Sequence, residues 1–584
     1  MNYKLSHTEE QKSITKLNYK KFWELLKDEK KSLIICTINI LINAVLNMVA
    51  PFLIGIAVNQ YMQTKQYGGV LTIACYLLLI YLGVLATGAI QGKVMGGVGQ
   101  RMLFKIRNLL FWKLQELPVD FFYQNKSGDL ISRINNDTDK LNLFFSQSLI
   151  QFMNSVFFIA GAATALLCIN FKLGATALAP AIVLWGFTKA SSRWVKKKNE
   201  KSMKTMGDLS AEVQENLTNF KVIIAFNRRD YFKQKFDESN EKNYQASVKA
   251  GLANNVFLPI YSFCSNVGQF IVLAFGIYLI TQGSFTVGFL ISFLTYINYF
   301  YDPLRRIATL WTSFQIALAA WDRISHILSM ESNLPVMECK KTEDPSNLLS
   351  FKDVTFKYPN GNEVLKHISF NLEAGKTYAF VGPTGGGKTT TASLIARLYD
   401  PTKGTIFFEG KDIRCYKSKE RARNIGFILQ DPFLFSGTVL DNIIYGNDEF
   451  SQLSEKGSIQ KIEEAGLHEL IDKFDNGLQT TINLNSEDIS LGQKQLIAFM
   501  RAVLRKPKLL ILDEATANID TVSEQLLEDI LQRLPSSTTK VIIAHRLNTI
   551  ANADEIYFVN SGTVVKAGSP QDAVNLLLHG KRES

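Results

Sequence analysis

A glycine-rich segment of this chain has the composition and spacing of a phosphate-binding loop. The segment reads Gly382-Pro-Thr-Gly-Gly-Gly-Lys388-Thr389, after the apolar run 378–381 and before the helix-like run 390–398. Glycines let backbone N–H groups close around phosphates, and the N-terminus of the following helix attracts the same anion. We therefore predict a nucleotide-phosphate site here rather than a purely structural turn. The residues predicted to bind are Gly382, Pro383, Thr384, Gly385, Gly386, Gly387, Lys388, Thr389 and Thr390.

Two carboxylates at the end of a later apolar run, 509–512, could complete a hydrolytic site. They are Asp513 and Glu514, and the C-terminal edge of the strands is where open α/β sheets bind ligands. Lys388 would reach the β- and γ-phosphates, while Thr389 would bind Mg²⁺. Asp513 would bind the same ion through water, and Glu514 would act as general base on the attacking water. The alternative is an ordinary solvated acidic pair, which the nearby phosphate loop makes less favoured.

Three further residues could act around a bound nucleotide. His545 follows the apolar run 541–543, and from there it could bridge the γ-phosphate and the attacking water. Gln430 also ends an apolar run, and its amide could meet Mg²⁺ and water. Tyr358 precedes the phosphate loop and could stack on adenine. A structural histidine and a surface tyrosine are the alternative interpretations.

A second anion site is predicted at Ser490-Leu-Gly492-Gln493, ahead of a long helical stretch. The Ser490 hydroxyl, the backbone amides of Gly492 and Gln493 and the helix dipole would together attract a phosphate. Because this segment is far in sequence from the phosphate loop, it could serve a second nucleotide.

The N-terminal half of the chain is apolar enough to span a membrane several times. A membrane helix needs about 20 apolar residues. Lysine and arginine crowd 93–140 and 189–249, whereas the short loops hold only Lys65 and Lys172, which places both termini in the cytoplasm. This distribution favours a membrane protein over a nucleic-acid binder despite the net charge of +11. The expected spans are 33–62, 69–90, 145–169, 173–190, 256–281 and 287–310.

These patterns predict an all-α membrane domain of six helices followed by an α/β phosphate-loop NTPase domain. The second domain should carry a helical insertion at about 440–490. The six cysteines show neither metal nor disulfide spacing, so we expect all of them to be reduced. The expected parts are an interfacial arm at 1–31, a membrane domain with long cytoplasmic extensions at 32–330, a linker at 331–348 and the nucleotide-binding domain at 349–584.

Together these residues resemble an ATP-binding cassette (ABC) transporter half of the exporter type, over residues 20–580. In the terms of that family, Tyr358 matches the adenine-stacking aromatic and 382–389 the Walker A motif. The resemblance also makes 121–133 and 222–228 the first and second coupling regions. The remaining matches are Gln430 to the Q-loop, 489–493 to the signature, 509–514 to Walker B, Asp520 to the D-loop and His545 to the switch histidine.

The resemblance implies a dimer, because in that family each ATP touches one chain's Walker motifs and the other chain's signature. Leu491 replaces a signature glycine, and the preceding run 482–486 lacks the usual acidic and glycine residues. A bulky side chain beside the γ-phosphate would crowd the approaching backbone amides. With Glu514 intact, this combination is similar to the consensus-Glu subunit of a heterodimeric multidrug exporter. We therefore expect a heterodimer; a homodimer, or a position that tolerates variation, is the alternative.

The function that this resemblance implies is ATP-driven export of drugs, lipids or peptides by alternating access, using ATP and Mg²⁺. We expect a multi-pass protein of the plasma membrane with a cytoplasmic cassette. The alternatives are an importer of metal chelates and an ATP-gated channel or regulator, although Glu514 and His545 favour turnover. Asn39, Asn43 and Asn47 share one face of the first span. They either line a substrate path or form hydrogen bonds between helices.

Overall fold

The chain folds into two compact units in a computed structural model. The first unit, Ser6–Gln115 with Ser127–Ser329, is helical, and the second, Met1–Leu5 with Glu116–Lys126 and Met330–Ser584, carries the sheets. The residues that the structure describes are 3, 24, 26–62, 64–339, 346–359, 361–450, 453–483, 489–513, 521–543, 552–567 and 572.

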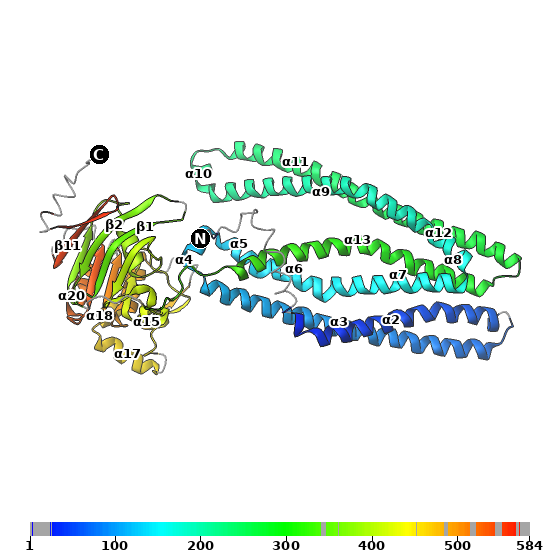
Figure 1. Cartoon of the computed structure of the whole chain (residues 1–584), viewed down its shortest axis with the longest axis horizontal. Coiled ribbons are helices and arrows are strands. Elements are labelled where there is room, and N and C mark those ends of the chain that lie inside the picture. The colour runs from blue at the N-terminus through cyan, green and yellow to red at the C-terminus, as the bar shows by residue number, and fades with distance from the viewer. Residues whose placement is uncertain are drawn as a thin grey trace. The chain divides into compact units, whose positions relative to one another are not determined.

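Long helices make up the first unit (Figure 1). Five helical stretches in the described part are long and apolar enough to cross a membrane, and five of the six predicted spans fall within them. The sixth, 287–310, lies in a helix that does not meet the same criterion, because Asn298 and Asp302 interrupt its apolar run; it stays a prediction. The five stretches are Lys30–Met62, Tyr67–Glu116, Ser127–Ile169, Phe171–Thr218 and Arg229–Thr281.

These stretches consist of α-helices joined directly or through short π-helical segments. Between α9 and α11 the chain turns back through α10, where the second coupling region was expected. In order, the elements are α2 (Lys30–Ile56), η1 (Ala57–Met62), α3 (Tyr67–Glu116), α5 (Ser127–Ser132), η2 (Arg133–Asp137), α6 (Thr138–Leu143), η3 (Phe144–Ser148), α7 (Leu149–Ile169), α8 (Phe171–Leu178), α9 (Pro180–Thr218), α10 (Phe220–Ala225), α11 (Arg229–Asn255), α12 (Phe257–Thr281) and α13 (Val287–Ser329).

Small residues and hydroxyl groups hold α2 against α13. A Cβ atom added to Gly288 would collide with the carbonyl oxygen of Gly55, so the two backbones meet at glycine. The Ser292 hydroxyl donates to the Pro51 carbonyl over 2.6 Å, and the Tyr296 hydroxyl donates to the Met48 carbonyl over 2.5 Å. Close backbone approach with hydroxyl hydrogen bonds is the usual way in which membrane helices associate.

The amides on α2 form hydrogen bonds between helices. Asn43 Nδ2 donates to Thr87 Oγ1 of α3 over 2.7 Å, and Gln91 Nε2 donates to the Asn39 carbonyl over 3.2 Å. Asn47 Nδ2 in turn donates to Asn43 Oδ1 over 3.1 Å. Of the two interpretations of this polar row, interhelical bonding accounts for the contacts that Asn43 makes.

Two sheets and flanking helices form most of the second unit. Five strands of the six-stranded sheet are parallel neighbours, and β12 joins them antiparallel to β11. The order is β12-β11-β3-β10-β9-β6, and a separate four-stranded antiparallel sheet has the order β2-β1-β4-β5. The bounds are β1 (Leu349–Lys357), β2 (Glu363–Leu372), β3 (Thr377–Val381), β4 (Lys403–Phe408), β5 (Lys411–Asp412), β6 (Ile425–Ile428), β7 (Gly437–Thr438), β8 (Thr481–Ile482), β9 (Leu509–Asp513), β10 (Thr539–Ile543), β11 (Glu555–Asn560) and β12 (Thr563–Ala567).

The helices of this unit include the predicted insertion at about 440–490, where α17 and α18 lie. Strands β3 and β9 are almost wholly buried, as expected for a parallel sheet covered on both faces. The helical bounds are α4 (Val119–Gln124), α14 (Lys388–Ile395), η4 (Ile413–Cys415), α15 (Ser418–Asn424), α16 (Val439–Ile443), α17 (Glu455–Glu464), α18 (His468–Ile471), η5 (Gly477–Gln479), α19 (Leu491–Val503) and α20 (Thr521–Arg533).

Tyr3 joins α4 to the beginning of the linker within this second unit. Its backbone N–H donates to Gln124 Oε1 over 3.0 Å, and Asn125 Nδ2 donates to its carbonyl over 2.9 Å. The Tyr3 hydroxyl donates to the Glu331 carbonyl over 2.9 Å, and its ring meets that of Phe121 edge-on. Most of the predicted interfacial arm, 1–31, lies outside the described residues. Sequence reasoning did not single out Tyr3.

The linker is fastened to the second unit near η4. The Met337 N–H donates to the Arg414 carbonyl over 3.0 Å, and the buried Arg397 guanidinium donates to the Pro335 carbonyl over 2.8 Å. Beside these bonds Cys339 forms a disulfide with Cys415. The expectation that all six cysteines are reduced was therefore wrong for this pair, because the fold brings together two positions 76 residues apart.

The disulfide gives a direct chemical prediction. When the protein is purified without thiols and alkylated under denaturing conditions, Cys339 and Cys415 should remain unmodified and yield one linked tryptic pair. Cys75 and Cys168, which are free and exposed, should react and so control for reagent access. Cys415→Ser should release the Cys339 thiol for alkylation, measured by mass spectrometry. Labelling of Cys339 in the unreduced wild-type protein would contradict the pairing.

Candidate nucleotide-binding site

The parallel strands bring the predicted site residues to one edge of the sheet. Ile543 of β10 pairs with Asp513 of β9 on one side and with Phe380 of β3 on the other. Ile428 of β6 pairs with Leu512 of β9. The carboxyl ends of β3, β10, β9 and β6 are thus aligned. Since open α/β sheets bind ligands at this edge, the strand register itself builds the site.

The backbone of the phosphate loop requires glycine at its two ends. Gly382 has φ 148° and Gly387 has φ 113°, a region that residues with a side chain rarely adopt. A Cβ atom on Gly382 would also collide with the carbonyl oxygen of Val559 in β11. The tip of the loop, Pro383 to Gly385, is exposed. The loop therefore presents backbone at the N-terminus of α14, as a phosphate cradle must.

Lys388 is held over this loop as the first residue of α14. Its Nζ atom donates to the Gly382 carbonyl over 2.8 Å and to the Pro383 carbonyl over 3.1 Å, and the residue is only 6% exposed. An ammonium group has three donors. Its position beside the loop tip suits it to contact phosphate oxygens, and that role stays a prediction.

Thr389 and Asp513 meet across the sheet edge. Thr389 Oγ1 donates to Asp513 Oδ1 over 3.3 Å, and Asp513 is almost completely buried. Gln430 is exposed two residues beyond β6, the strand next to β9. Hydroxyl, carboxylate and amide oxygens are the ligands that Mg²⁺ prefers. The described residues therefore fit a magnesium–nucleotide complex.

Tyr358 lies beside the phosphate loop rather than alone on the surface. Its hydroxyl is 3.1 Å from Thr390 Oγ1 in α14, and its ring packs edge-on against Tyr399. Burial raises the pKa of Tyr358, and the hydrogen bond with Thr390 opposes this shift in part. Sequence reasoning missed Tyr399, although an aromatic residue soon after the phosphate-loop helix was a usable signal. The interpretation of Tyr358 as an isolated surface tyrosine is not supported.

The signature segment forms a capping box at the N-terminus of α19. Ser490 Oγ accepts from the Gln493 N–H over 3.1 Å, and Gln493 Oε1 accepts from the Ser490 N–H over 3.0 Å. Leu491, the first residue of the helix, is 41% exposed, and Gly492 follows it. The side chain of Leu491 is therefore not required by the hydrophobic core. Within α19 sequence reasoning missed Gln495, whose buried amide has no hydrogen-bond partner among the residues that the structure describes.

Three predicted residues, Glu514, His545 and Asp520, lie outside the described part of the chain. In sequence, Glu514 directly follows Asp513, and His545 comes two residues after the end of β10. Their roles stay predictions.

Known proteins match both units of this chain. Residues 33–304 match the family model of the ABC transporter transmembrane region, and residues 365–517 match the model described as ABC transporter. A Bacillus subtilis (strain 168) protein named uncharacterized ABC transporter ATP-binding protein YfiC is 33% identical over 573 residues, covering 96% of this chain and 92% of that protein.

Two further relatives carry more specific names. The probable multidrug resistance ABC transporter ATP-binding/permease protein YheH of the same bacterium is 30% identical over 525 residues, which is 88% of this chain and 76% of that protein. The ATP-dependent lipid A-core flippase of Vibrio parahaemolyticus is 30% identical over 577 residues, which is 95% of each chain.

The position of Lys388 predicts a specific loss of nucleotide binding. Hydrogen bonds to charged groups contribute about 1.5–3 kcal/mol, so Lys388→Ala should weaken binding of a fluorescent ATP analogue by about tenfold to hundredfold. Lys508→Ala is the matched control, since Lys508 is half-exposed and pairs with Glu409 over 2.6 Å. Equal affinities of the Lys388 variant and wild type would remove Lys388 from the site.

Proposed function

The chain belongs to the ABC transporter family, and from this membership we propose that it is one half of an exporter of drugs, lipids or peptides. An ABC cassette joined to a transmembrane region makes the protein an ATPase coupled to transport. The observation that carries the proposal is the meeting of the phosphate loop, Thr389 and Asp513 at one sheet edge. The names of the multidrug resistance and flippase relatives support the export of amphipathic molecules.

In the proposed mechanism, the loop amides and Lys388 bind the β- and γ-phosphates, and Tyr358 stacks on adenine. Thr389, Asp513 and Gln430 would hold Mg²⁺, which neutralises phosphate charge when bound. Glu514 would take a proton from the attacking water, and His545 would orient that water. This chemistry needs positioning more than covalent catalysis.

We infer that the working protein contains a second half, as ABC half-transporters do. A signature supplied by that half would close over the phosphate loop, while Ser490, Gly492 and Gln493 of this chain would face the partner's nucleotide. Leu491 beside an intact Glu514 supports a heterodimer, in which this chain gives its partner the weaker signature. A homodimer remains the competing proposal.

Exposed apolar side chains on both units support such a partner. The short helix α10 and its ends expose Phe220, Val222, Ile224 and Phe226. The second unit exposes an aromatic cluster beyond β6, in which Phe435 and Tyr445 rings lie 4.3 Å apart. Exposed apolar patches of this kind mark interaction surfaces. We propose that the second half covers them.

The proposed location is the plasma membrane, with the cassette and both termini in the cytoplasm, because the basic residues gather on that side. An importer of metal chelates and an ATP-gated channel share this architecture. A channel would not need turnover, whereas Glu514 and His545 are the residues that turnover requires.

The general-base role of Glu514 has a clear test. Glu514→Gln keeps the size of the side chain but cannot accept the proton, so ATP hydrolysis in proteoliposomes should fall about 10²- to 10⁴-fold. Binding of the fluorescent ATP analogue should persist, because the phosphate loop is unchanged. Near-normal phosphate release by this variant would rule out the role.

The heterodimer proposal predicts low ATPase activity for this chain purified alone in lipid. Leu491→Gly should raise that activity, because it removes a bulky side chain from the place where backbone amides approach phosphate. Leu491→Ile keeps the bulk and is the control that should stay low. Robust turnover by a demonstrated wild-type homodimer would contradict the heterodimer but not the exporter.

A further inference from the structure

A dense row of positive charge follows the apolar segment of α9. Residues 189–204 contain seven lysines and arginines and a single acidic residue, Glu200. Six of the seven basic side chains are exposed, and Lys198 is partly buried. We refer to them as the basic face of α9: Lys189, Arg193, Lys196, Lys197, Lys198, Lys201 and Lys204.

The protein leaves this charge almost unneutralised. Among the described residues, the ion pair of the basic face is Lys196 Nζ with Glu200 Oε1 at 3.8 Å, both exposed. Basic residues on α3 also follow an apolar segment, but they differ from the basic face of α9 in their acidic partners. Three of them pair with acids of neighbouring segments: Arg101 with Glu29 at 2.7 Å, Lys105 with Asp28 at 2.9 Å and Arg107 with Asp139 at 3.0 Å.

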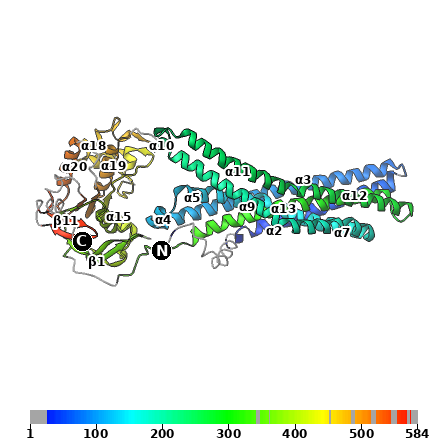
Figure 2. The same ribbon diagram turned by 90° about the horizontal axis from the view of Figure 1, so that it is seen from above.

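Within the part of the chain that the structure describes, the helices packed against α9 bring no acidic side chain to the basic face. The antiparallel neighbour α11 lies beside it in both views (Figures 1 and 2), and Asn199 Nδ2 donates to Asn254 Oδ1 over 3.0 Å. The facing part of α11, residues 243–255, has no acid and adds Lys249. Helix α12 has no charged residue, while α8 and α10 contribute only Lys172 and Lys221.

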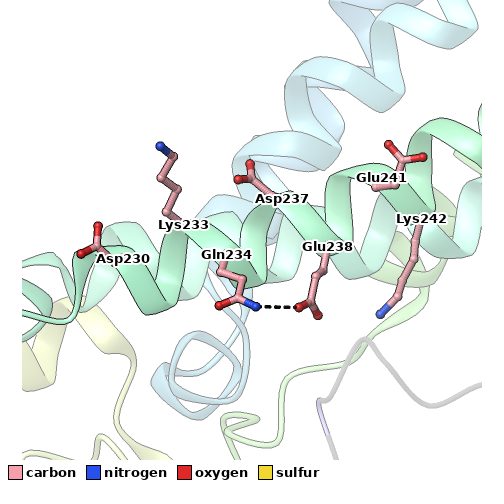
Figure 3. A pocket seen from close by; sticks show the side chains of 7 residues that line it. All are labelled: Asp230, Lys233, Gln234, Asp237, Glu238, Glu241 and Lys242. Atoms are coloured by element: carbon pink, nitrogen blue, oxygen red, sulfur yellow. Dashed lines mark hydrogen bonds between the residues drawn. The ribbon is translucent and has the colours of Figure 1, made fainter.

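The acids of α11 lie farther along that helix, away from this part of α9. Figure 3 shows these four acids together with two lysines and a glutamine around a shallow hollow. The hollow is lined by one helix alone, so it makes no enclosed site. It does provide a region of mixed charge for comparison. Its lining residues are Asp230, Lys233, Gln234, Asp237, Glu238, Glu241 and Lys242.

Part of the basic face lies at the depth of lipid headgroups. At about 1.5 Å per helical residue, Lys189 is about 27 Å and Lys197 about 39 Å from Phe171, where the stretch begins. A bilayer has a hydrocarbon core of about 30 Å and a total thickness of about 40–45 Å, so with Phe171 at the far edge of the core the near headgroups lie at about 30–38 Å, between Lys189 and Lys197. Lys204, at about 50 Å, falls beyond the headgroups.

Tryptophan marks the same boundary. Lys189 Nζ lies 5.1 Å from the centre of the exposed Trp185 ring. Exposed tryptophans gather at membrane–water interfaces, and lysine and arginine extend their charged ends to the headgroups. Trp194, one turn beyond Lys189, is also exposed.

We propose that the basic face of α9 binds the phosphate headgroups of anionic phospholipids in the leaflet next to it. Unpaired lysines and arginines beside a membrane are attracted to anionic lipid, within about one Debye length of the surface. Arg193 adds a planar group that can bind a phosphate through two hydrogen bonds. Lys189, Arg193, Lys196 and Lys197 carry most of the binding, and Lys201 and Lys204 contribute little.

The test compares two variants that lose the same charge. The full chain, assembled with its partner half if it has one, is placed in phosphatidylcholine vesicles with spin-labelled phosphatidylglycerol or phosphatidylcholine. Electron spin resonance then gives the selectivity for the anionic lipid. Lys189→Gln/Arg193→Gln/Lys196→Gln/Lys197→Gln should lose at least about fivefold in selectivity. Lys201→Gln/Lys204→Gln/Lys233→Gln/Lys242→Gln, the matched control, should stay near wild type.

Binding of the ATP analogue by both variants reports correct folding independently of lipid. High salt should reduce wild-type selectivity, because the attraction is screened. Three outcomes would each overturn the proposal. The first variant could keep its selectivity, or both variants could lose it equally. The wild-type protein could also show no selectivity because a second half covers the face. None of these outcomes bears on ATP hydrolysis or export.

Discussion

The nucleotide site depends on the parallel ladders that β9 forms with β10 and β6. These ladders place Asp513 beside the strand ends that lead to the phosphate loop and to Gln430, segments far apart in sequence. Parallel neighbouring strands must be joined by crossover connections, and the helices between these strands provide them. A one-residue slip of β9 would turn Asp513 to the other face of the sheet and away from Thr389. The position of Asp513 relative to Thr389 is therefore set by the register of the buried strand β9.

Sequence reasoning could single out the candidate site residues whose signals are local, and their roles stay predictions. The phosphate loop, Lys388, Thr389 and Asp513 were predicted because glycine spacing, an apolar run and a strand end are visible within short windows. Tyr399 was missed although it follows the phosphate-loop helix closely, whereas the Cys339–Cys415 disulfide was missed because only the folded chain brings its two segments together. The two-domain fold was predicted for a similar reason, because long hydrophobic runs and short strand patterns can both be recognised within short stretches of sequence. Glu514, His545 and Asp520 lie outside the described residues, and their roles rest on sequence and family resemblance.

The membrane unit shows how far polar residues can be interpreted from sequence alone. A periodic row of asparagines indicated a shared helix face, but periodicity cannot say what that face meets. In the structure Asn43 bonds to Thr87, so at that position the amide holds helices together. For the basic residues, the acids that they pair with in the structure say more about their role than their number in the sequence does. The arginines and lysines of α3 and α9 are similar in sequence, yet in the described part acids pair with three of those on α3 and, on the basic face of α9, with Lys196 alone.

The fastening of the linker shortens the tether between α13 and the cassette. Helix α13 ends at Ser329, Tyr3 bonds to the Glu331 carbonyl, and Arg397 fastens the chain at Pro335. Six residue steps can span at most about 20 Å when fully extended. The polar stretch that looks like a flexible spacer in sequence is therefore only a short free connection. Without the Arg397 guanidinium, the fastening of the linker to the segment around η4 would begin two residues later, at Met337.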